Sequence, residues 1–321
     1  MELLRDPADR GYPTEYLLSR IRGRRAGLLK DWKTLLFDAA PLDALLSSRA
    51  RSGVVEVSPD AVWRRLMKEY RWVYGQMNER LRELFSLFFL YAELRTISIC
   101  LRQMKDRKSA RLEELLEESL LSNELRKVCL SSPDSTAAVA AISRIFSRLS
   151  PSFGDLPRVF ADEGLRGVER GLTNQFLQYA VQQKLHPFIK TFLVRMIDAR
   201  NLLRLAVSVQ QETVSAPDFI AFGSLPMEQL VRIQEQRDLV AAGALVRQYA
   251  GVKVELQDPS QVEHALYRTT TQYLKQAGRD PLGVGTILDY LWRCSIEAMN
   301  LSILFFGKNV ERDVLANELV T

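Results

Sequence analysis

The chain has 321 residues, of which 47% are hydrophobic and 26% are charged, a composition typical of a globular protein with a sizeable core. The net charge of +5 is small and both signs are mixed along the chain, which argues against a nucleic-acid-binding protein. Two histidines and three isolated cysteines argue against a metal-ligand cluster or a disulfide framework, and the cysteines are expected to be reduced core residues of a cytosolic protein.

The first predicted helix begins near Tyr16, after a polar segment, Met1–Pro13, that is expected to be loosely held. At 100° per residue its apolar side chains form one stripe: Leu17, Leu18, Ile21 and Leu28. Arg20 and Arg24 point away from this stripe and are expected to be solvated. Arg25 falls inside the stripe, where an arginine either extends to the surface or meets a carboxylate.

A short helix is expected after Pro41, and then an irregular loop from Ser52 that contains the sequence VVEV. Residues 61–105 are predicted to form one long helix or two. The part from Leu84 to Met104 is apolar almost all round, as is typical of a central core helix. Glu93 lies within it, with mostly apolar neighbours three and four positions away, so its carboxyl group is expected to be buried.

The rest of the chain also has helical periodicity. Helices are predicted at residues 111–132, 135–149, 156–210, 226–235, 238–250, 260–277, 284–306 and 311–319. The predicted helix at residues 156–210 is expected to be interrupted near Gly171 and before Pro187. Ser224 is expected to mark the start of a helix, with Pro226 just inside it. Strand signals are sparse, so the predicted fold class is all-α.

A polar pair recurs within these apolar helices. Glu297 and Asn300 lie three residues apart, and therefore on one face, and Asp198 and Asn201 repeat the pattern upstream. Glu93 is a third instance, with Thr96 in the place of the asparagine. The three acids are separated by 105 and 99 residues. We therefore predict three similar helical modules at residues 1–108, 109–215 and 216–321, with the acids at equivalent, mostly buried positions and Arg25 as the partner of Glu93.

No catalytic constellation emerges from the sequence. Gly283 and Gly285 precede a helix, but without a preceding strand or a following P-loop lysine they indicate a helix-entry turn rather than a phosphate site. Three lone carboxylates at repeat positions indicate a structural role rather than acid–base chemistry. Because no catalytic constellation is present, we expect no enzyme activity and no cofactor. No charge-free apolar run reaches membrane-spanning length and no signal-peptide core is present, so we also expect no direct membrane insertion.

Three segments in order resemble one family. The C-terminal DPLGVGTILDYL…EAMNLSILFFGK, the N-terminal YLLSRIRGRRAGLL at Tyr16–Leu29 and IDARNLL at 197–203 are similar to the C subunit of archaeal and bacterial V/A-type ATPases, the counterpart of V-ATPase subunit d. The similarity extends over nearly the whole chain. In the first copy of the repeat, the sequence ELRT departs from the family's pattern of an acid followed three residues later by asparagine.

The resemblance implies three helical subdomains in a funnel with pseudo-threefold symmetry. It also implies a non-catalytic rotor part at the cytoplasmic face of a membrane, which transmits torque between central-stalk subunits of the D and F type and the membrane proteolipid ring. Two alternatives stay open. One is a helical-repeat scaffold or adaptor outside rotary ATPases, and the other is a nucleic-acid-binding protein that uses the arginines between Arg20 and Arg25.

Overall fold

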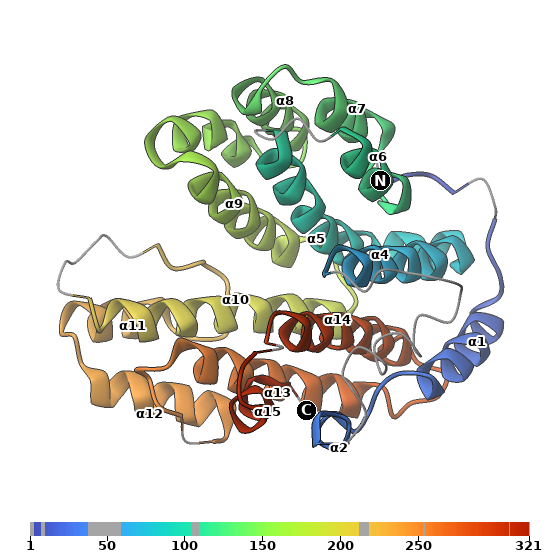
Figure 1. The fold of residues 1–321 in the computed structure, drawn as a ribbon. Coiled ribbons are helices and arrows are strands. Elements are labelled where there is room, and N and C mark those ends of the chain that lie inside the picture. The colour runs from blue at the N-terminus through green and yellow to red at the C-terminus, as the bar shows by residue number, and fades with distance from the viewer. Residues whose placement is uncertain are drawn as a thin grey trace. The chain divides into compact units, whose positions relative to one another are not determined.

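The computed structural model describes residues 3–7, 10–37, 59–104, 109–211, 218–252, 254–307 and 309–320. In this part of the chain the secondary structure is helical apart from one isolated antiparallel bridge between Leu4 and Leu121 (Figure 1). The predicted all-α fold class is therefore confirmed. The expected helix after Pro41 and the VVEV segment lie outside the described residues.

The helices have the following bounds: α1 Thr14–Ala26, α2 Trp32–Phe37, α4 Pro59–Gln76, α5 Glu79–Gln103, α6 Ser109–Glu118, α7 Asn123–Ser131, α8 Ser135–Phe146, the 3₁₀ helix η2 Pro151–Asp155, α9 Leu156–Gln182, α10 Pro187–Ser208, α11 Met227–Glu235, α12 Leu239–Ala250, α13 Pro259–Ala277, α14 Val284–Phe306 and α15 Arg312–Glu318.

Helix ends that carry strong local signals lie where the sequence predicts them. α14 has the predicted bounds, with Gly283 before its first residue and Gly307 after its last. Residues 61–105 form two helices, because the Asn78 side chain accepts a hydrogen bond from the Leu81 N–H and starts α5. Within α9 the backbone departs from helical geometry at Gly164, where φ is 67°, and not near Gly171 as predicted. The expected interruption before Pro187 is present.

The chain divides into two compact units. Unit 1 comprises Met1–Thr14 and Met67–Ile197, and unit 2 comprises Glu15–Leu66 and Asp198–Thr321. The boundaries fall inside α1, α4 and α10, so each of these helices contributes residues to both units, α1 only its first residue to unit 1. The three-module division at residues 108 and 215 stays a prediction.

The core of unit 1 is built around α5. This helix packs against α9, α8, α6 and α7, and aromatic rings from α4 and α5 form a cluster: Tyr70, Tyr74, Phe85, Phe88 and Phe89. The side chain of Phe89 is fully buried. An apolar helix surrounded by other helices has the all-round apolar sequence that α5 shows.

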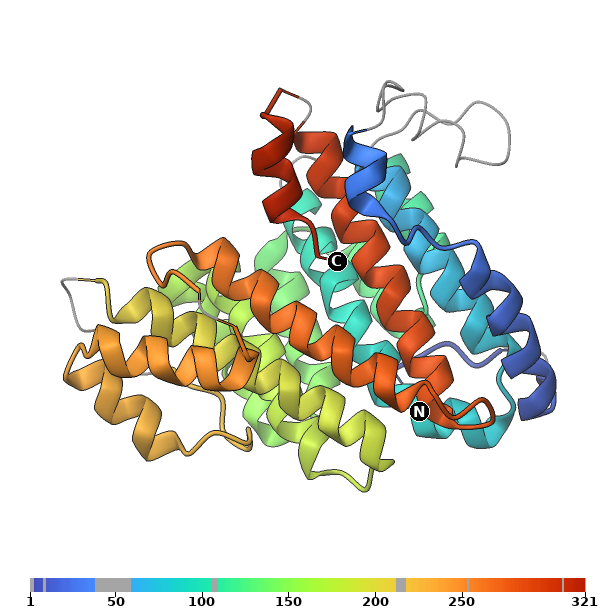
Figure 2. The same cartoon turned by 90° about the horizontal axis from the view of Figure 1, so that it is seen from below.

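In unit 2, α13 and α14 lie side by side (Figure 1, Figure 2), and α12 and α15 also contact α13. A second apolar cluster joins the C-terminal half of α10 to α11, α12 and the start of α13, with Leu202, Leu230, Val246 and Val262 fully buried. The short helix α2 packs on α15. Unit 2 therefore brings together helices that are far apart in the sequence.

Candidate functional site

Glu93 of α5 is buried in unit 1, with 2% of its surface exposed. Its carboxylate accepts hydrogen bonds from the Ser119 hydroxyl at 3.0 Å and the Leu120 backbone N–H at 2.5 Å. Burial raises the pKa of this carboxyl group, while the hydrogen bonds act in the opposite direction. Glu93 thus holds the turn between α6 and α7, where the predicted helix 111–132 is broken into two.

Asp198 of α10 holds a matching turn in unit 2. Its carboxylate accepts hydrogen bonds from the Ser224 N–H at 2.8 Å, the Ser224 hydroxyl at 2.6 Å and the Leu225 N–H at 3.3 Å. The Tyr249 hydroxyl lies 3.5 Å from the same carboxylate. Burial is again the largest influence and raises the pKa of the Asp198 carboxyl group. The Ser224 side chain therefore binds Asp198 and is not the predicted cap of α11, whose N-cap position is occupied by Pro226.

The two acids bind their partners at the same sequence separations. Each contacts a serine 26 residues later and the backbone N–H of a leucine 27 residues later. This agreement supports the idea that the two segments are copies of one module, because unrelated buried acids have no reason to share both spacings and both partner types.

The asparagines form a second recurring contact. The Asn201 side-chain amide donates to the Ile220 carbonyl and accepts from the Ile220 N–H, both at 2.8 Å. Asn300 of α14 makes the same pair of bonds to Val320, at 2.9 and 3.0 Å. We call each of these two-bond contacts an asparagine clamp. Each clamp satisfies both backbone groups of one residue that packs in the core of unit 2.

Glu297, the third predicted acid, is also buried, with 8% of its surface exposed. It shares α14 with Asn300. All three predicted acids, Glu93, Asp198 and Glu297, are thus buried within their units.

The predicted pairing of Arg25 with Glu93 is wrong. Arg25 lies 3.0 Å from the Asp289 carboxylate, within unit 2. Arg293, one turn along α14, contacts the same carboxylate at 2.9 Å. Asp289 is fully buried and burial raises the pKa of its carboxyl group, although Arg293 and Arg25 act in the opposite direction. The sequence reasoning missed Asp289, although an acid in an apolar helix was available as a signal.

Asp289 lies at a tight corner between α13 and α14. A side-chain carbon at Gly285 would lie 2.2 Å from the Ala277 carbonyl oxygen, and one at Gly278 would lie 3.0 Å from Asp289 Cβ. Arg22 of α1 donates to the Pro281 carbonyl in the connecting turn. This segment is a helix-entry turn, as predicted, and α1 is anchored to it by Arg22 and Arg25.

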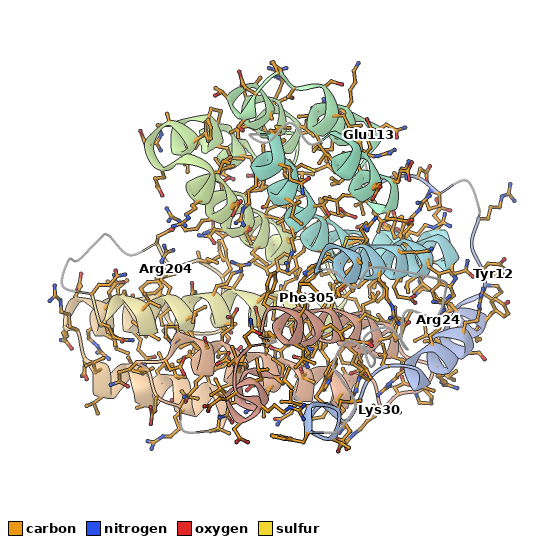
Figure 3. All side chains as sticks on the ribbon, viewed as in Figure 1. Tyr12, Arg24, Lys30, Glu113, Arg204 and Phe305 are labelled. Carbon is orange, nitrogen blue, oxygen red and sulfur yellow. The ribbon has the colours of Figure 1, made fainter. Side chains whose placement is uncertain are left out.

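The outer side of α1 carries other arginines. Arg24, labelled on α1 in Figure 3, is exposed, as the sequence predicts. Arg20 is partly buried, with its guanidinium carbon 5.7 Å from the centre of the Tyr16 ring. In the described part of the chain, no group of three or more His, Cys, Asp or Glu side chains is placed to hold a metal ion.

Within the ranges that the structure describes, one helix, α5, is long and apolar enough to cross a membrane by length and composition alone, and 67% of its most apolar window is buried inside the protein. That burial is typical of the core helix of a folded domain, as predicted for Leu84–Met104.

Residues 45–316 match the family model described as ATP synthase (C/AC39) subunit. The chain belongs to this family. A search of curated proteins gave no match. Members of the ATP synthase (C/AC39) subunit family are components of V/A-type rotary ATPases, so the chain is a subunit of a membrane-associated rotary complex. Within this subunit, Glu93, Asp198 and the asparagine clamps stabilise the fold through hydrogen bonds to backbone groups.

Proposed function

We propose that the chain is the non-catalytic rotor subunit that links the central stalk to the membrane ion-carrying ring and transmits torque for ion transport. Its partners are then central-stalk subunits of the D and F type and the proteolipid ring, and its place is the cytoplasmic face of the membrane, without insertion. The observation that carries the proposal is the family match over residues 45–316.

The internal contacts support a role in bearing load. A part that transmits torque must keep its helices in register while force is applied. In unit 2, α1 is anchored by an ion pair to a fully buried carboxylate, and the two asparagine clamps hold Ile220 and Val320. Packed and hydrogen-bonded contacts of this kind resist sliding because protein interiors are dense and have low compressibility.

We also propose that the chain contains three related modules, at residues 1–108, 109–215 and 216–321. The shared spacings of Glu93 and Asp198 to their partners and the clamps of Asn201 and Asn300 support the repeat itself. The partners of Glu93 and Asp198 lie beyond residues 108 and 215, so these contacts join one module to the next. An experimental structure tests this organisation separately from function: the three segments should superpose with their acids at equivalent positions, and acids on different elements would contradict the repeat.

Assembly tests the rotor proposal. The chain should co-purify with stalk and ring subunits, and the head with its stalk should dissociate from the ring when the chain is removed. The contact with the ring is expected to be polar, so raising the salt concentration should weaken it as the Debye length falls below about 8 Å. Persistent attachment of the stalk to the ring without this chain would contradict the proposal. A scaffold outside rotary ATPases would bind neither.

A further inference from the structure

Unit 1 contains an open cavity of about 1020 Å³. Its walls come from the N-terminal segment at residues 4–7, from α4 and from the turn between α6 and α7. Three cationic side chains line it, Arg5, Lys68 and Arg71, with Asp6 and Glu118 as the lining carboxylates. Neither the buried acids nor the asparagine clamps lie on these walls.

Two of the guanidinium groups converge on one atom. Arg5 Nη1 and Arg71 Nη1 both donate to the Glu117 carbonyl oxygen, at 3.3 and 2.7 Å. Arg71 also contacts the Glu118 carboxylate at 3.4 Å. A guanidinium carries five N–H donors, and the contacts within the described residues engage a single nitrogen of each group.

A third arginine lies close to this pair. Burial lowers the pKa of Arg5, and the positive charges of Arg126 and Arg71 lower it further. The Nε of Arg126 is buried and has no hydrogen-bond partner among the described residues. Asp6 and Glu118 compensate part of this positive charge, and a bound anion would compensate more of it.

The rest of the wall is also suited to an anion. Ser122 and Asn123 line the cavity at the start of α7, and the N-terminal end of a helix favours negative charge. Trp72 also lines the cavity. The volume is that of a site for a drug-sized molecule, which exceeds a single small ion.

We propose that this cavity binds a phosphate group carried by a larger molecule. Arginine forks match the oxygen geometry of phosphate and contact it through two nitrogens at once. Arg5 and Arg71 would hold the phosphate oxygens, Lys68 would add charge at the rim, and Trp72 would face the remainder of the ligand. The phosphate belongs either to a soluble polyphosphate or nucleotide, or to a lipid headgroup. The inference does not depend on the rotor role.

The test uses the full purified chain at low ionic strength. Pyrophosphate and ATP are titrated by calorimetry, and vesicles of phosphatidylcholine with and without phosphatidic acid are tested by flotation. Arg71→Gln should weaken binding of the effective probe by about tenfold or more, because it removes charge-assisted hydrogen bonds. Lys68→Gln alters an exposed side chain and should weaken binding without disturbing the fold. Arg158→Gln, at a residue 72% exposed on α9, is the matched control and should bind as the unmodified chain does.

Binding of pyrophosphate or ATP that both cavity variants weaken supports the proposal with a soluble ligand. Flotation only with phosphatidic acid, weakened by the same variants, supports it with a lipid headgroup. No binding of any probe overturns it. Equal binding by the unmodified chain, Lys68→Gln and Arg71→Gln also overturns it, since the phosphate then binds elsewhere.

Discussion

The asparagine clamps illustrate how one side chain fixes a stretch of backbone. An amide side chain carries both an acceptor and donors, so it can satisfy the N–H and the carbonyl of one residue at once. Asn201 does this for Ile220 and Asn300 does it for Val320. Both asparagines are almost fully buried, where water cannot replace the lost bonds.

Alanine at either clamp position should destabilise the protein. Each substitution leaves two backbone groups without partners, and a buried unsatisfied group costs about 1–3 kcal/mol. We expect Asn201→Ala and Asn300→Ala to lower the free energy of unfolding by similar amounts, about 2–4 kcal/mol each, in urea denaturation. Ser152→Ala, at an exposed site, is the control. A decrease in the free energy of unfolding no larger than that of the control would contradict the structural role of the clamps.

Asp198 should make stability depend on pH. Burial raises the pKa of its carboxyl group in the folded state, so the folded protein holds this proton more tightly than the unfolded chain does. The resulting contribution to the free energy of unfolding is complete below the unfolded pKa of about 3.9 and is lost as the pH rises through the raised folded pKa. Denaturant titrations at successive pH values should show a smaller decline over this window for Asp198→Asn than for the unmodified chain. Identical pH profiles would contradict the predicted shift.

At the scale of single elements, the sequence predicts helices best where glycine flanks them. The bounds of α14 follow from Gly283 and Gly307. The break between α6 and α7 is not predictable locally, because it is made by distant contacts: Leu3 accepts a hydrogen bond from the Ser122 N–H, and Glu93 accepts one from the Leu120 N–H. Tertiary contacts override local helical preference in such places.

For the buried polar residues, too, the sequence does not identify the distant partners. The burial of Glu93 and Asp198 follows from their apolar neighbours, but their partners include backbone N–H groups, which every residue except proline has. The repeat does not single out Asp289, because Lys190 occupies the position 99 residues earlier. The position of Arg25 on an apolar stripe predicts that it meets a carboxylate, but the sequence does not indicate that this carboxylate belongs to Asp289.

Two glycines in helices should respond in opposite ways to alanine. At Gly285 the added carbon would lie 2.2 Å from the Ala277 carbonyl oxygen, so α13 and α14 would have to separate, and we expect a loss of about 1–3 kcal/mol. At Gly23 of α1 nothing lies within 4 Å of that position, so alanine should stabilise the helix by up to about 1 kcal/mol. Melting temperatures of the two variants measure this difference. Equal shifts would mean that the α13–α14 corner is not tightly packed.

The attachment of α1 to this corner can be measured by a double-mutant cycle. Asp289→Ala leaves two arginines without their buried partner and should cost about 3–5 kcal/mol. Arg25→Ala should cost less, because its side chain is 30% exposed and solvent screens its charge. The double variant should be less destabilised than the sum, with a coupling of about 0.5–3 kcal/mol. Additive losses would show that the ion pair does not stabilise the contact.

The whole molecule has an all-α fold and belongs to a family of rotary ATPase subunits. Composition and periodicity predict the fold class, and three segments of sequence predict the family. The role within the complex is a property of the assembly, because it depends on which surfaces meet the stalk and the ring. A coupling role is therefore tested in the assembled complex rather than in the isolated chain.

The most direct test is ATP-driven ion uptake into vesicles that contain the complex, measured together with ATP hydrolysis, with and without this chain. The proposed role assigns the nucleotide sites to the catalytic head and not to this chain, so hydrolysis should continue when the chain is absent. Ion uptake should fall to background, because torque no longer reaches the ring, and adding back the purified chain should restore it. If uptake persists at the same ratio to hydrolysis without the chain, the rotor role is contradicted.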